Sequence, residues 1–388
     1  MIPRQAAQTA LELSQGFPIV AITGPRQSGK TTLARSLFAD HPYVSLEDPL
    51  EREFALNDPR GFLARFDRGA IIDEAQRCPE LFSYLQTRVD ASRRVGEFIL
   101  TGSQQFGLRA GISQSLAGRV GLLQLLPFSL TELQAAGRAP NRLDTMLWQG
   151  GYPPIVDRQV RPALWFANYV GTYLERDVRQ LLGVRDLDAF QRFIRLCAAR
   201  TGQLLNLSSL AVDCSIAQST AREWLTVLET SYLIIRLPPF HRNFGKRLVK
   251  TPKLYFLDVG LAAWLLGVRE AQTLSTHPLR GALFESWVIA EFVKQRLNAG
   301  MPADLHFWRD NVGHEVDVVV ETAAGLQAIE IKSGASFLPQ WLNVARKWST
   351  FAAGEALPPR VVYGGELGFE REGSMVCGWP DVAAALPH

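Results

Sequence analysis

The sequence has few cysteines and no long uncharged apolar run. Its 388 residues include four cysteines, none of them in a C-x-x-C pair, so neither a zinc site nor a disulfide framework is indicated. Four reduced, buried thiols are typical of a cytosolic protein. The most apolar stretch, residues 257–268, is short and contains Asp258, which excludes a membrane span. The first seven residues lack the apolar core of a signal peptide. We therefore expect a cytoplasmic protein with no membrane partner.

The sequence also lacks a strong charge of either sign. The formal net charge is +3, so any surface that binds nucleic acid must be a local basic patch. Apolar residues make up 47% of the chain, which is enough for complete cores, and the length predicts two or three domains. The stretch Gly-Gly-Tyr-Pro-Pro at 150–154 indicates a boundary or hinge. We expect three domains, at residues 1–150, 151–275 and 276–388.

A glycine-containing segment follows an apolar run at residues 17–23 and precedes a helix-like segment at 32–38. Its spacing is that of a P-loop: Gly, four residues, then Gly-Lys-Thr. Backbone N–H groups of such a loop cradle phosphate oxygens, Lys30 reaches the β- and γ-phosphates, and the Thr31 hydroxyl ligates Mg²⁺. The alternative is a chance match in a surface loop. We predict that ATP or ADP contacts Gly24, Pro25, Arg26, Gln27, Ser28, Gly29, Lys30, Thr31 and Thr32.

A second apolar strand is predicted at residues 69–73, about forty residues after the loop, and it ends in Asp73-Glu74. In an open α/β sheet, ligands lie at the carboxyl ends of the strands. We expect Asp73 to contact nucleotide-bound Mg²⁺ and Glu74 to orient or deprotonate the attacking water. The alternative is an ordinary helix start, where acidic residues are favoured.

Three further residues are candidates for sensing or stabilising the transferred phosphate. The strand predicted at 97–104 ends in small polar residues, and the Ser103 hydroxyl or the Gln104 amide would report loss of the γ-phosphate; a plain turn is the alternative. Arg119 is a candidate arginine finger, acting in cis or from a neighbouring subunit of a homo-oligomer; an ordinary surface arginine is the alternative.

Taken in order, these motifs resemble a prokaryotic AAA-type ATPase family whose members carry a C-terminal domain of unknown function. The resemblance runs through the whole chain. It implies an AAA-like parallel sheet in which strand 97–104 lies between the P-loop strand and the Asp-Glu strand. The motifs that carry it are residues 24–32, Ser-Leu-Glu-Asp-Pro at 45–49, Ile-Ile-Asp-Glu-Ala-Gln at 71–76, Leu-Thr-Gly-Ser at 100–103, Leu-Ala-Gly-Arg at 116–119 and Leu-Pro-Phe-Ser-Leu-Thr-Glu-Leu at 126–133.

The middle of the chain has the element order of a winged helix, which is helices followed by a hairpin. DNA contacts are plausible through a basic loop at 236–253 and through Ser219 and Arg222 on the third helix. With so few basic residues on that helix, base-specific reading is not supported. The alternative is a protein contact, which winged helices also make. We expect helices at 190–199, 205–211 and 219–228, and strands at 232–238 and 253–256.

The C-terminal region carries a second constellation of charged residues. Glu285 lies on the apolar face of a helix predicted at 280–293, and two strands follow. Asp317 lies on the first strand, and Glu330 and Lys332 share a face of the second. The pattern resembles the PD-(D/E)xK restriction-endonuclease-like fold, although the proline before Asp317 is missing. That resemblance implies that Glu285, Asp317 and Glu330 bind Mg²⁺ and that Lys332 positions or activates water. A buried Asp–Lys ion pair or an inactive binding module would leave the same pattern.

The sequence therefore predicts an α/β protein with an N-terminal AAA-type P-loop sheet, a central winged helix and a C-terminal restriction-endonuclease-like domain. The expected activity is ATP hydrolysis with ATP and Mg²⁺ as cofactors, coupled to rearrangement of outer domains that bind DNA or a partner. One alternative is an ATP-regulated, metal-dependent DNA nuclease in defence or repair. The other is a non-catalytic signalling or scaffold ATPase that recruits a protein partner.

Overall fold

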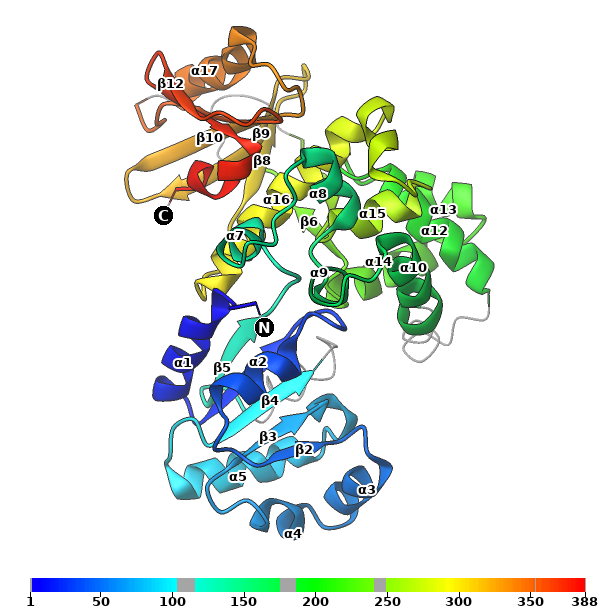
Figure 1. The fold of residues 1–388 in the computed structure, drawn as a ribbon, viewed down its shortest axis with the longest axis vertical. Helices are drawn as coiled ribbons and strands as arrows, with labels where there is room; N and C mark the ends of the chain where they lie inside the picture. The colour runs from blue at the N-terminus through cyan, green and yellow to red at the C-terminus, as the bar shows by residue number, and fades with distance from the viewer. Residues whose placement is uncertain (1, 103–115, 175–185, 241–248, 353, 388) are drawn as a thin grey trace. The chain divides into compact units, whose positions relative to one another are not determined.

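The computed structural model describes residues 2–102, 116–174, 186–240, 249–352 and 354–387 (Figure 1). Ser103 and the basic loop residues 241–248 lie outside the described residues. The chain forms two compact units. The first comprises residues 1–128, 230–232 and 296–302, and the second comprises 129–229, 233–295 and 303–388.

The first unit is built on a sheet of five strands whose neighbours are all parallel. Their order is β2-β3-β4-β1-β5, so β4 lies between the P-loop strand β1 and the Asp-Glu strand β3. The strand order implied by the AAA resemblance is therefore confirmed. The strands are β1 (Ile19–Thr23), β2 (Tyr43–Ser45), β3 (Ala70–Asp73), β4 (Phe98–Gly102) and β5 (Val120–Gln124).

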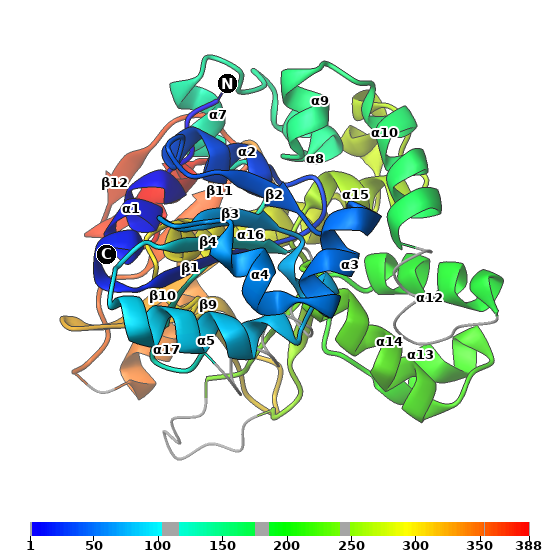
Figure 2. The ribbon, with the colours of Figure 1, turned by 90° about the horizontal axis from the view of Figure 1, so that it is seen from below.

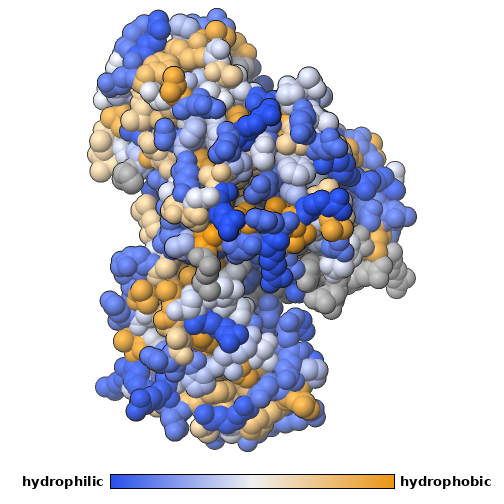
Figure 3. All heavy atoms as spheres, viewed as in Figure 1, coloured by the Kyte–Doolittle hydropathy of each residue, from blue (hydrophilic) through white to orange (hydrophobic). Residues whose placement is uncertain are grey.

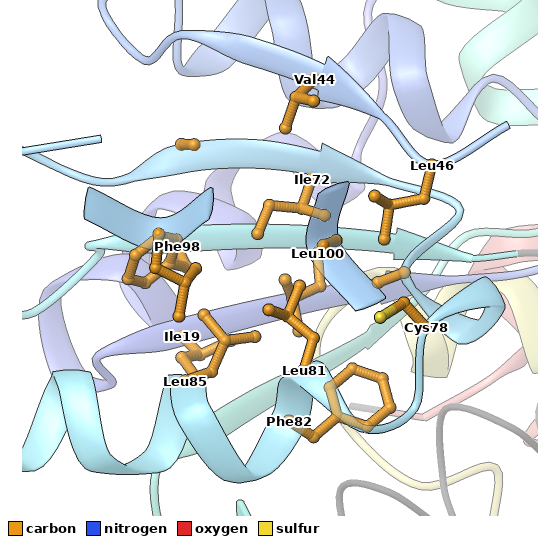
Figure 4. Packing of buried hydrophobic residues seen from close by; sticks show 14 of the residues in the cluster. Ile19, Val44, Leu46, Ile72, Cys78, Leu81, Phe82, Leu85, Phe98 and Leu100 are labelled. Carbon is orange, nitrogen blue, oxygen red and sulfur yellow. The ribbon is translucent and has the colours of Figure 1, made fainter. Parts of the chain in front are cut away.

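Helices cover both faces of this sheet, as Figure 2 shows for α1 and α2 on one side and α4 and α5 on the other. The alternation of side chains along β1 explains this, because Ile19 packs with α5 while Val20 packs with α1 and α2. Figure 4 shows Leu81 and Leu85 of α5 packed against the strands. The helices are α1 (Ala6–Gly16), α2 (Lys30–Leu37), α3 (Pro49–Asn57), α4 (Pro59–Ala64), the 3₁₀ turn η1 (Ala75–Arg77) and α5 (Leu81–Ser92).

The second unit begins with helices. Gly150 and Gly151, where a boundary or hinge was expected, are buried, and Gly151 N donates to Asp258 Oδ2 at 2.8 Å. The elements expected of a winged helix are present in the expected order, as three helices and an antiparallel hairpin. The elements up to this hairpin are α7 (Leu130–Ala135), α8 (Leu143–Gln149), α9 (Pro153–Asp157), α10 (Pro162–Tyr169), the π-helical turn η2 (Val170–Leu174), α12 (Leu187–Ala199), α13 (Leu207–Cys214), α14 (Gln218–Thr230), β6 (Ile234–Leu237) and β7 (Lys253–Phe256).

The C-terminal part of the second unit contains a six-stranded mixed sheet in the order β12-β13-β11-β10-β9-β8. β9 and β10 form the predicted hairpin, and β10 pairs with β11 in parallel. Helix α17 packs Ala345 and Trp348 against β9 and β10. The elements are α15 (Val259–Leu265), η3 (Ala271–Thr276), α16 (Arg280–Asn298), β8 (His306–Arg309), β9 (Glu315–Thr322), β10 (Gly325–Lys332), η4 (Pro339–Trp341), α17 (Leu342–Phe351), β11 (Arg360–Tyr363), β12 (Phe369–Arg371), β13 (Ser374–Gly378) and η5 (Trp379–Ala385).

Most large apolar side chains lie in these cores. On the face drawn in Figure 3, hydrophobic side chains are interspersed with strongly hydrophilic ones. Single exposed apolar residues such as Leu50, which is 76% exposed, are ordinary on protein surfaces. Comparing the effect of an alanine substitution at the exposed Leu50 with that at a buried leucine therefore tests the packing directly.

We predict that Leu85→Ala destabilises the first unit by about 2–5 kcal/mol, because Leu85 is fully buried between α5 and the sheet and its removal leaves a cavity. The matched change Leu50→Ala should cost less than about 0.5 kcal/mol. Urea unfolding followed by fluorescence measures both. Equal losses for the two variants would contradict this packing.

Candidate functional site

The P-loop leaves the carboxyl end of β1 and enters α2. Gly24 has φ 151°, and a Cβ at this position would lie 2.1 Å from the carbonyl oxygen of Leu125. Gly29 has φ 94° and stands directly before α2. Side chains are excluded at the first glycine by the neighbouring backbone, and both glycines adopt a conformation that other residues rarely take. The loop is therefore held close to the end of the sheet, with the start of α2 beside it.

Arg4 fixes this loop from the N-terminal segment. Its guanidinium donates to Ser28 O at 2.8 Å and to Leu126 O at 2.6 Å, and it lies 4.8 Å from the ring centroid of Phe128. It therefore ties the loop to the segment that follows β5. Arg4 was missed because nothing in its sequence neighbourhood marks a site.

The loop also has a buried polar atom that suits a phosphate ligand. Ser28 is fully buried, and its Oγ has no hydrogen-bond partner among the residues that the structure describes. A buried hydroxyl without a partner is unfavourable unless a ligand satisfies it. Pro25 is buried, Arg26 is half-buried, and Gln27 and Thr32 are exposed. The residues of this loop therefore fit a phosphate group.

Lys30 is buried and folds back across the loop. Its Nζ donates to Gly24 O at 3.2 Å and to Pro25 O at 2.8 Å. Burial lowers the pKa of Lys30 to about 8, although the charges of Glu74 and Asp73 oppose this. The ammonium therefore lies close enough to Glu74, the predicted catalytic base, and to Asp73, the predicted Mg²⁺ ligand, to interact with both electrostatically.

Asp73 lies at the centre of the site and accepts hydrogen bonds from three hydroxyl groups. Thr31 Oγ1 lies 3.0 and 3.2 Å from its two oxygens, Tyr43 donates to Oδ2 at 2.8 Å, and Thr101 donates to Oδ1. Burial, followed by the contact with Asp73, raises the pKa of Tyr43 to about 12. The predicted pair of Thr31 and Asp73 is thus brought together, and hydroxyl and carboxylate oxygens suit Mg²⁺.

Tyr43 and Thr101 are site residues that sequence reasoning missed. Tyr43 begins β2 and Thr101 lies near the end of β4, the two strands that flank β3. The rule that ligands lie at the carboxyl ends of parallel strands, applied to every strand, would have pointed to Thr101.

Glu74 follows Asp73 in the left-handed conformation, with φ 55° and ψ 41°. This conformation is costly for a residue other than glycine and is found preferentially at functional sites. Gln76 donates to Glu74 Oε2. Glu74 is therefore held in a defined position immediately after the Mg²⁺-ligand candidate.

Arg119 lies away from its own P-loop. β1 and β5 are parallel, with Ile19 opposite Val120, and the Arg119 carbonyl accepts from Ile19 N at 3.1 Å. The P-loop leaves the other end of β1, about 16 Å away at ~3.3 Å per residue. The guanidinium instead donates to Asp90 at 2.6 and 2.9 Å. Arg119 is therefore too far from the P-loop of its own chain to act as an arginine finger in cis, and that alternative is wrong. A role of Arg119 at the nucleotide of a neighbouring subunit stays a prediction.

In the C-terminal region, Asp317, Glu330 and Lys332 lie together at the end of the β9–β10 hairpin. Asp317 Oδ2 accepts from Ile331 N at 2.7 Å and from Lys332 Nζ at 3.0 Å, and Lys332 also pairs with Glu330 at 2.8 Å. Burial, followed by the charge of Asp317, raises the pKa of Glu330 to about 8. Although burial opposes it, the two carboxylates raise the pKa of Lys332.

Glu285, on α16, is paired with a lysine that was expected to contact DNA. Lys253 Nζ lies 3.0 Å from Glu285 Oε1 and 2.5 Å from Glu315 Oε1, and the Tyr255 hydroxyl donates to Glu285. Burial, followed by the charge of Asp317, raises the pKa of Glu285. Lys253 therefore faces the protein interior, where its side chain is 3% exposed.

These carboxylates do not fit the metal site implied by the nuclease resemblance. Within the described ranges, no three His, Cys, Asp or Glu side chains lie together in a group that could hold a metal ion. Lysine ammonium groups instead occupy oxygens of Glu285, Asp317 and Glu330. Lys332 thus joins Asp317 to Glu330, whereas Lys253 joins Glu285 to Glu315, which was not an expected ligand.

Two of the described basic residues that were expected at a DNA-binding surface in the middle segment are engaged in ion pairs. Arg236 pairs with Glu229 at 3.0 Å through Nε, and Lys253 is buried as described. Ser219 and Arg222 are exposed on α14.

None of the described helices combines the length and the apolar character needed to cross a membrane.

Family comparisons assign the three parts of the chain. Residues 16–134 match a family model described as an AAA domain. Residues 140–272 match a domain of unknown function (DUF8612), and residues 280–382 match another (DUF4143). The first unit thus has the fold of an AAA-type P-loop ATPase, as the sequence motifs predicted.

Two solved structures are distantly similar. A Walker-type ATPase of Pyrococcus abyssi is 16% identical with a TM-score of 0.47, and the match covers 68% of this chain and 96% of that chain. The RuvB Holliday junction branch migration motor of Thermotoga maritima is 20% identical with a TM-score of 0.31, covering 60% and 87%. Similarities this low say nothing about the activity of this chain.

Two curated relatives are much closer in sequence. They are uncharacterized proteins of Mycobacterium bovis and Mycobacterium tuberculosis, each 35% identical over 335 residues. The match covers 85% of this chain and 73% of each relative. The chain therefore belongs to the same family as these two mycobacterial proteins, and in this chain an AAA domain is followed by two domains of unknown function.

Proposed function

We propose that the chain is an ATP-binding, Mg²⁺-dependent ATPase whose nucleotide cycle rearranges the segments that follow its AAA domain. The observation that supports this most is the contact of the Thr31 hydroxyl with the Asp73 carboxylate at 3.0 and 3.2 Å, beside Lys30. Phosphoryl transfer by P-loop enzymes needs these groups together. The match to an AAA domain supports ATP as the nucleotide.

Each residue then has a defined task. The backbone N–H groups of the loop and Lys30 bind the phosphates, and Thr31 and Asp73 hold Mg²⁺. When bound, Mg²⁺ neutralises negative charge on the β- and γ-phosphates. Glu74 orients the attacking water and accepts its proton. Arg119 acts, if at all, on the nucleotide of a neighbouring subunit, since it lies at the far end of its own sheet.

A hydrogen bond at the end of β1 supports the coupling. The Tyr232 hydroxyl donates to Thr23 Oγ1 at 2.7 Å, and Thr23 directly precedes the P-loop. Residues 230–232 belong to the first unit, although the chain before and after them belongs to the second. Gain or loss of the γ-phosphate would therefore be transmitted along the chain to α14 and β6.

We further propose that α12, α13, α14, β6 and β7 form a winged helix and that the domains are residues 1–150, 151–275 and 276–388. The element order supports the first proposal. With Arg236 and Lys253 engaged in ion pairs, Arg222 is the exposed basic residue on α14. A protein partner is therefore the alternative to DNA. Binding to DNA would weaken steeply with salt because phosphate contacts release counterions, and protein binding need not.

We predict that Lys30→Ala lowers ATP affinity about 100-fold, because it removes a charged donor to the phosphates. Glu74→Gln should keep ATP binding but lower turnover about 100-fold or more, since it removes the proton acceptor. Equilibrium binding of a fluorescent ATP analogue and phosphate release measure the two effects. Glu80→Gln, an exposed carboxylate before α5, is the control and should behave like the wild type. Unchanged turnover in both site variants would contradict the proposal.

We predict that Tyr43→Phe raises the Mg²⁺ concentration needed for half-maximal ATPase activity about 10-fold, because it removes a hydroxyl that orients Asp73. ATP binding in EDTA should not change. Titration of activity with MgCl₂ makes the measurement. Tyr84→Phe on α5 is the matched control, and an identical Mg²⁺ dependence in the two variants would exclude this role for Tyr43.

A metal-dependent DNA nuclease is the second candidate, favoured by one observation. Lys332 Nζ contacts both Asp317 and Glu330, the residues that the nuclease resemblance singles out, and this supports the candidate. Cleavage by this domain would also need a divalent cation to replace Lys253 at Glu285.

For this candidate we predict nicking of supercoiled DNA in MgCl₂ or MnCl₂, lost in both Lys332→Ala and Asp317→Ala. Each variant removes a group that nucleases of this type need. Lys347→Ala, a change on α17, is the control for loss of a positive charge. Intact DNA in every condition, with ATP still hydrolysed, would reject cleavage and leave the C-terminal domain as a binding module.

A further inference from the structure

The C-terminal carboxylates form one cluster with cations that lie on β7, β8 and β10. Glu285 lies on α16, Glu315 and Asp317 on β9, and Glu330 on β10. The side chains of Glu285, Asp317 and Glu330 are 18%, 11% and 3% exposed, so their charges need compensation. The cations that supply it are Lys253 on β7, Arg309 on β8 and Lys332 on β10.

Lys253 is the most buried of these cations, with 3% of its side chain exposed. Its ammonium bridges Glu285 and Glu315 at 3.0 and 2.5 Å and lies 5.5 Å from the centroid of the Phe307 ring. A buried ammonium is stable only with close carboxylate partners of this kind. Lys253 therefore satisfies two carboxylates that belong to different elements.

Other oxygens of the cluster are engaged as well, whereas Glu330 Oε1 is buried without a hydrogen-bond partner among the described residues. Asp317 Oδ2 accepts from Ile331 N and Lys332 Nζ, and Glu315 Oε2 accepts from Arg309 at 3.0 Å. A divalent cation needs several oxygens at about 2.0–2.6 Å. To obtain them between Glu285 and Glu315, it would have to displace Lys253, whose ammonium already neutralises both carboxylates.

We propose that the Lys253 ammonium takes the place of a divalent cation between Glu285 and Glu315, so that the cluster is a metal-free ionic junction joining β7 to α16 and β9. The C-terminal domain then contributes binding or mechanical coupling rather than cleavage. This inference is independent of the ATPase site and argues against the nuclease candidate.

The test uses the full-length protein without nucleotide and follows the unfolding midpoint of the second unit in EDTA and in 1 mM MnCl₂. Wild type should show the same midpoint in both. Lys253→Met should lower the midpoint by about 10 °C in EDTA, because it leaves buried carboxylates unpaired, and MnCl₂ should restore at least about half of the loss. Lys253→Arg keeps the positive charge and should remain insensitive to MnCl₂.

Lys294→Met is the matched control, because Lys294 is equally buried and pairs with Glu291 on α16 at 2.8 Å. It should also lower the midpoint, but MnCl₂ should not restore it, because Glu291 Oε2 is held by the backbone N–H of Leu130. Equal recovery in Lys253→Met and Lys294→Met would overturn the proposal.

A second comparison, between wild type and Glu285→Gln, tests the proposal even if Lys253→Met does not fold. A rise of the wild-type midpoint in MnCl₂ that disappears in Glu285→Gln would show that the cluster binds metal with Lys253 in place, and would overturn the inference. The same midpoint in EDTA and MnCl₂ for both proteins supports it. All the proteins share an unchanged P-loop, so binding of Mn²⁺ there cannot produce the difference.

Discussion

The carboxylate of Asp73 is the point on which the structure of the first unit depends. It is buried, and hydroxyls from α2, β2 and β4 donate to it. Thr101 lies near the carboxyl end of β4, next to the carboxyl end of β3, whereas Tyr43 begins β2 and reaches Asp73 with its long side chain. A charge in this position is tolerable when several donors satisfy it. The same arrangement presents an oriented oxygen ligand beside Thr31 and Lys30, which is what an Mg²⁺-nucleotide requires.

The first unit was largely predictable from the sequence. A buried parallel strand must be a nearly continuous apolar run, and residues 19–23, 70–72 and 98–100 are such runs. The P-loop was also predictable, because the structure requires its glycine and the sequence therefore has to show it. A Cβ at Gly24 would lie against the Leu125 carbonyl. Contacts between residues distant in sequence could not be predicted in this way. Neither Arg4 on the loop nor Tyr43 on Asp73 belongs to a local pattern, and the distance of Arg119 from the loop required the strand register.

In the second unit, contacts between residues distant in sequence were even harder to predict. Helices α12, α13, α14 and α16 and the two hairpins were predictable from their periodicity and turns, including the turn that ends at Gly325, the first residue of β10, with φ 138°. Lys253 looked like one member of a basic surface loop, yet it is buried between Glu285 and Glu315. Counting charges along the chain cannot distinguish an exposed lysine from one that neutralises a buried cluster. Both units thus depend on the compensation of buried carboxylates, by hydroxyls at Asp73 and by lysines at Glu285 and Asp317.

The central claim is that Asp73 and Thr31 form an Mg²⁺-dependent nucleotide site. The most direct measurement is titration calorimetry of ATP binding with MgCl₂ and with EDTA, for wild type and for Asp73→Asn. The account predicts that wild type binds ATP at least about 10-fold more tightly with Mg²⁺, and that Asp73→Asn loses most of this difference while keeping its affinity in EDTA. The same Mg²⁺ enhancement in both proteins would contradict it.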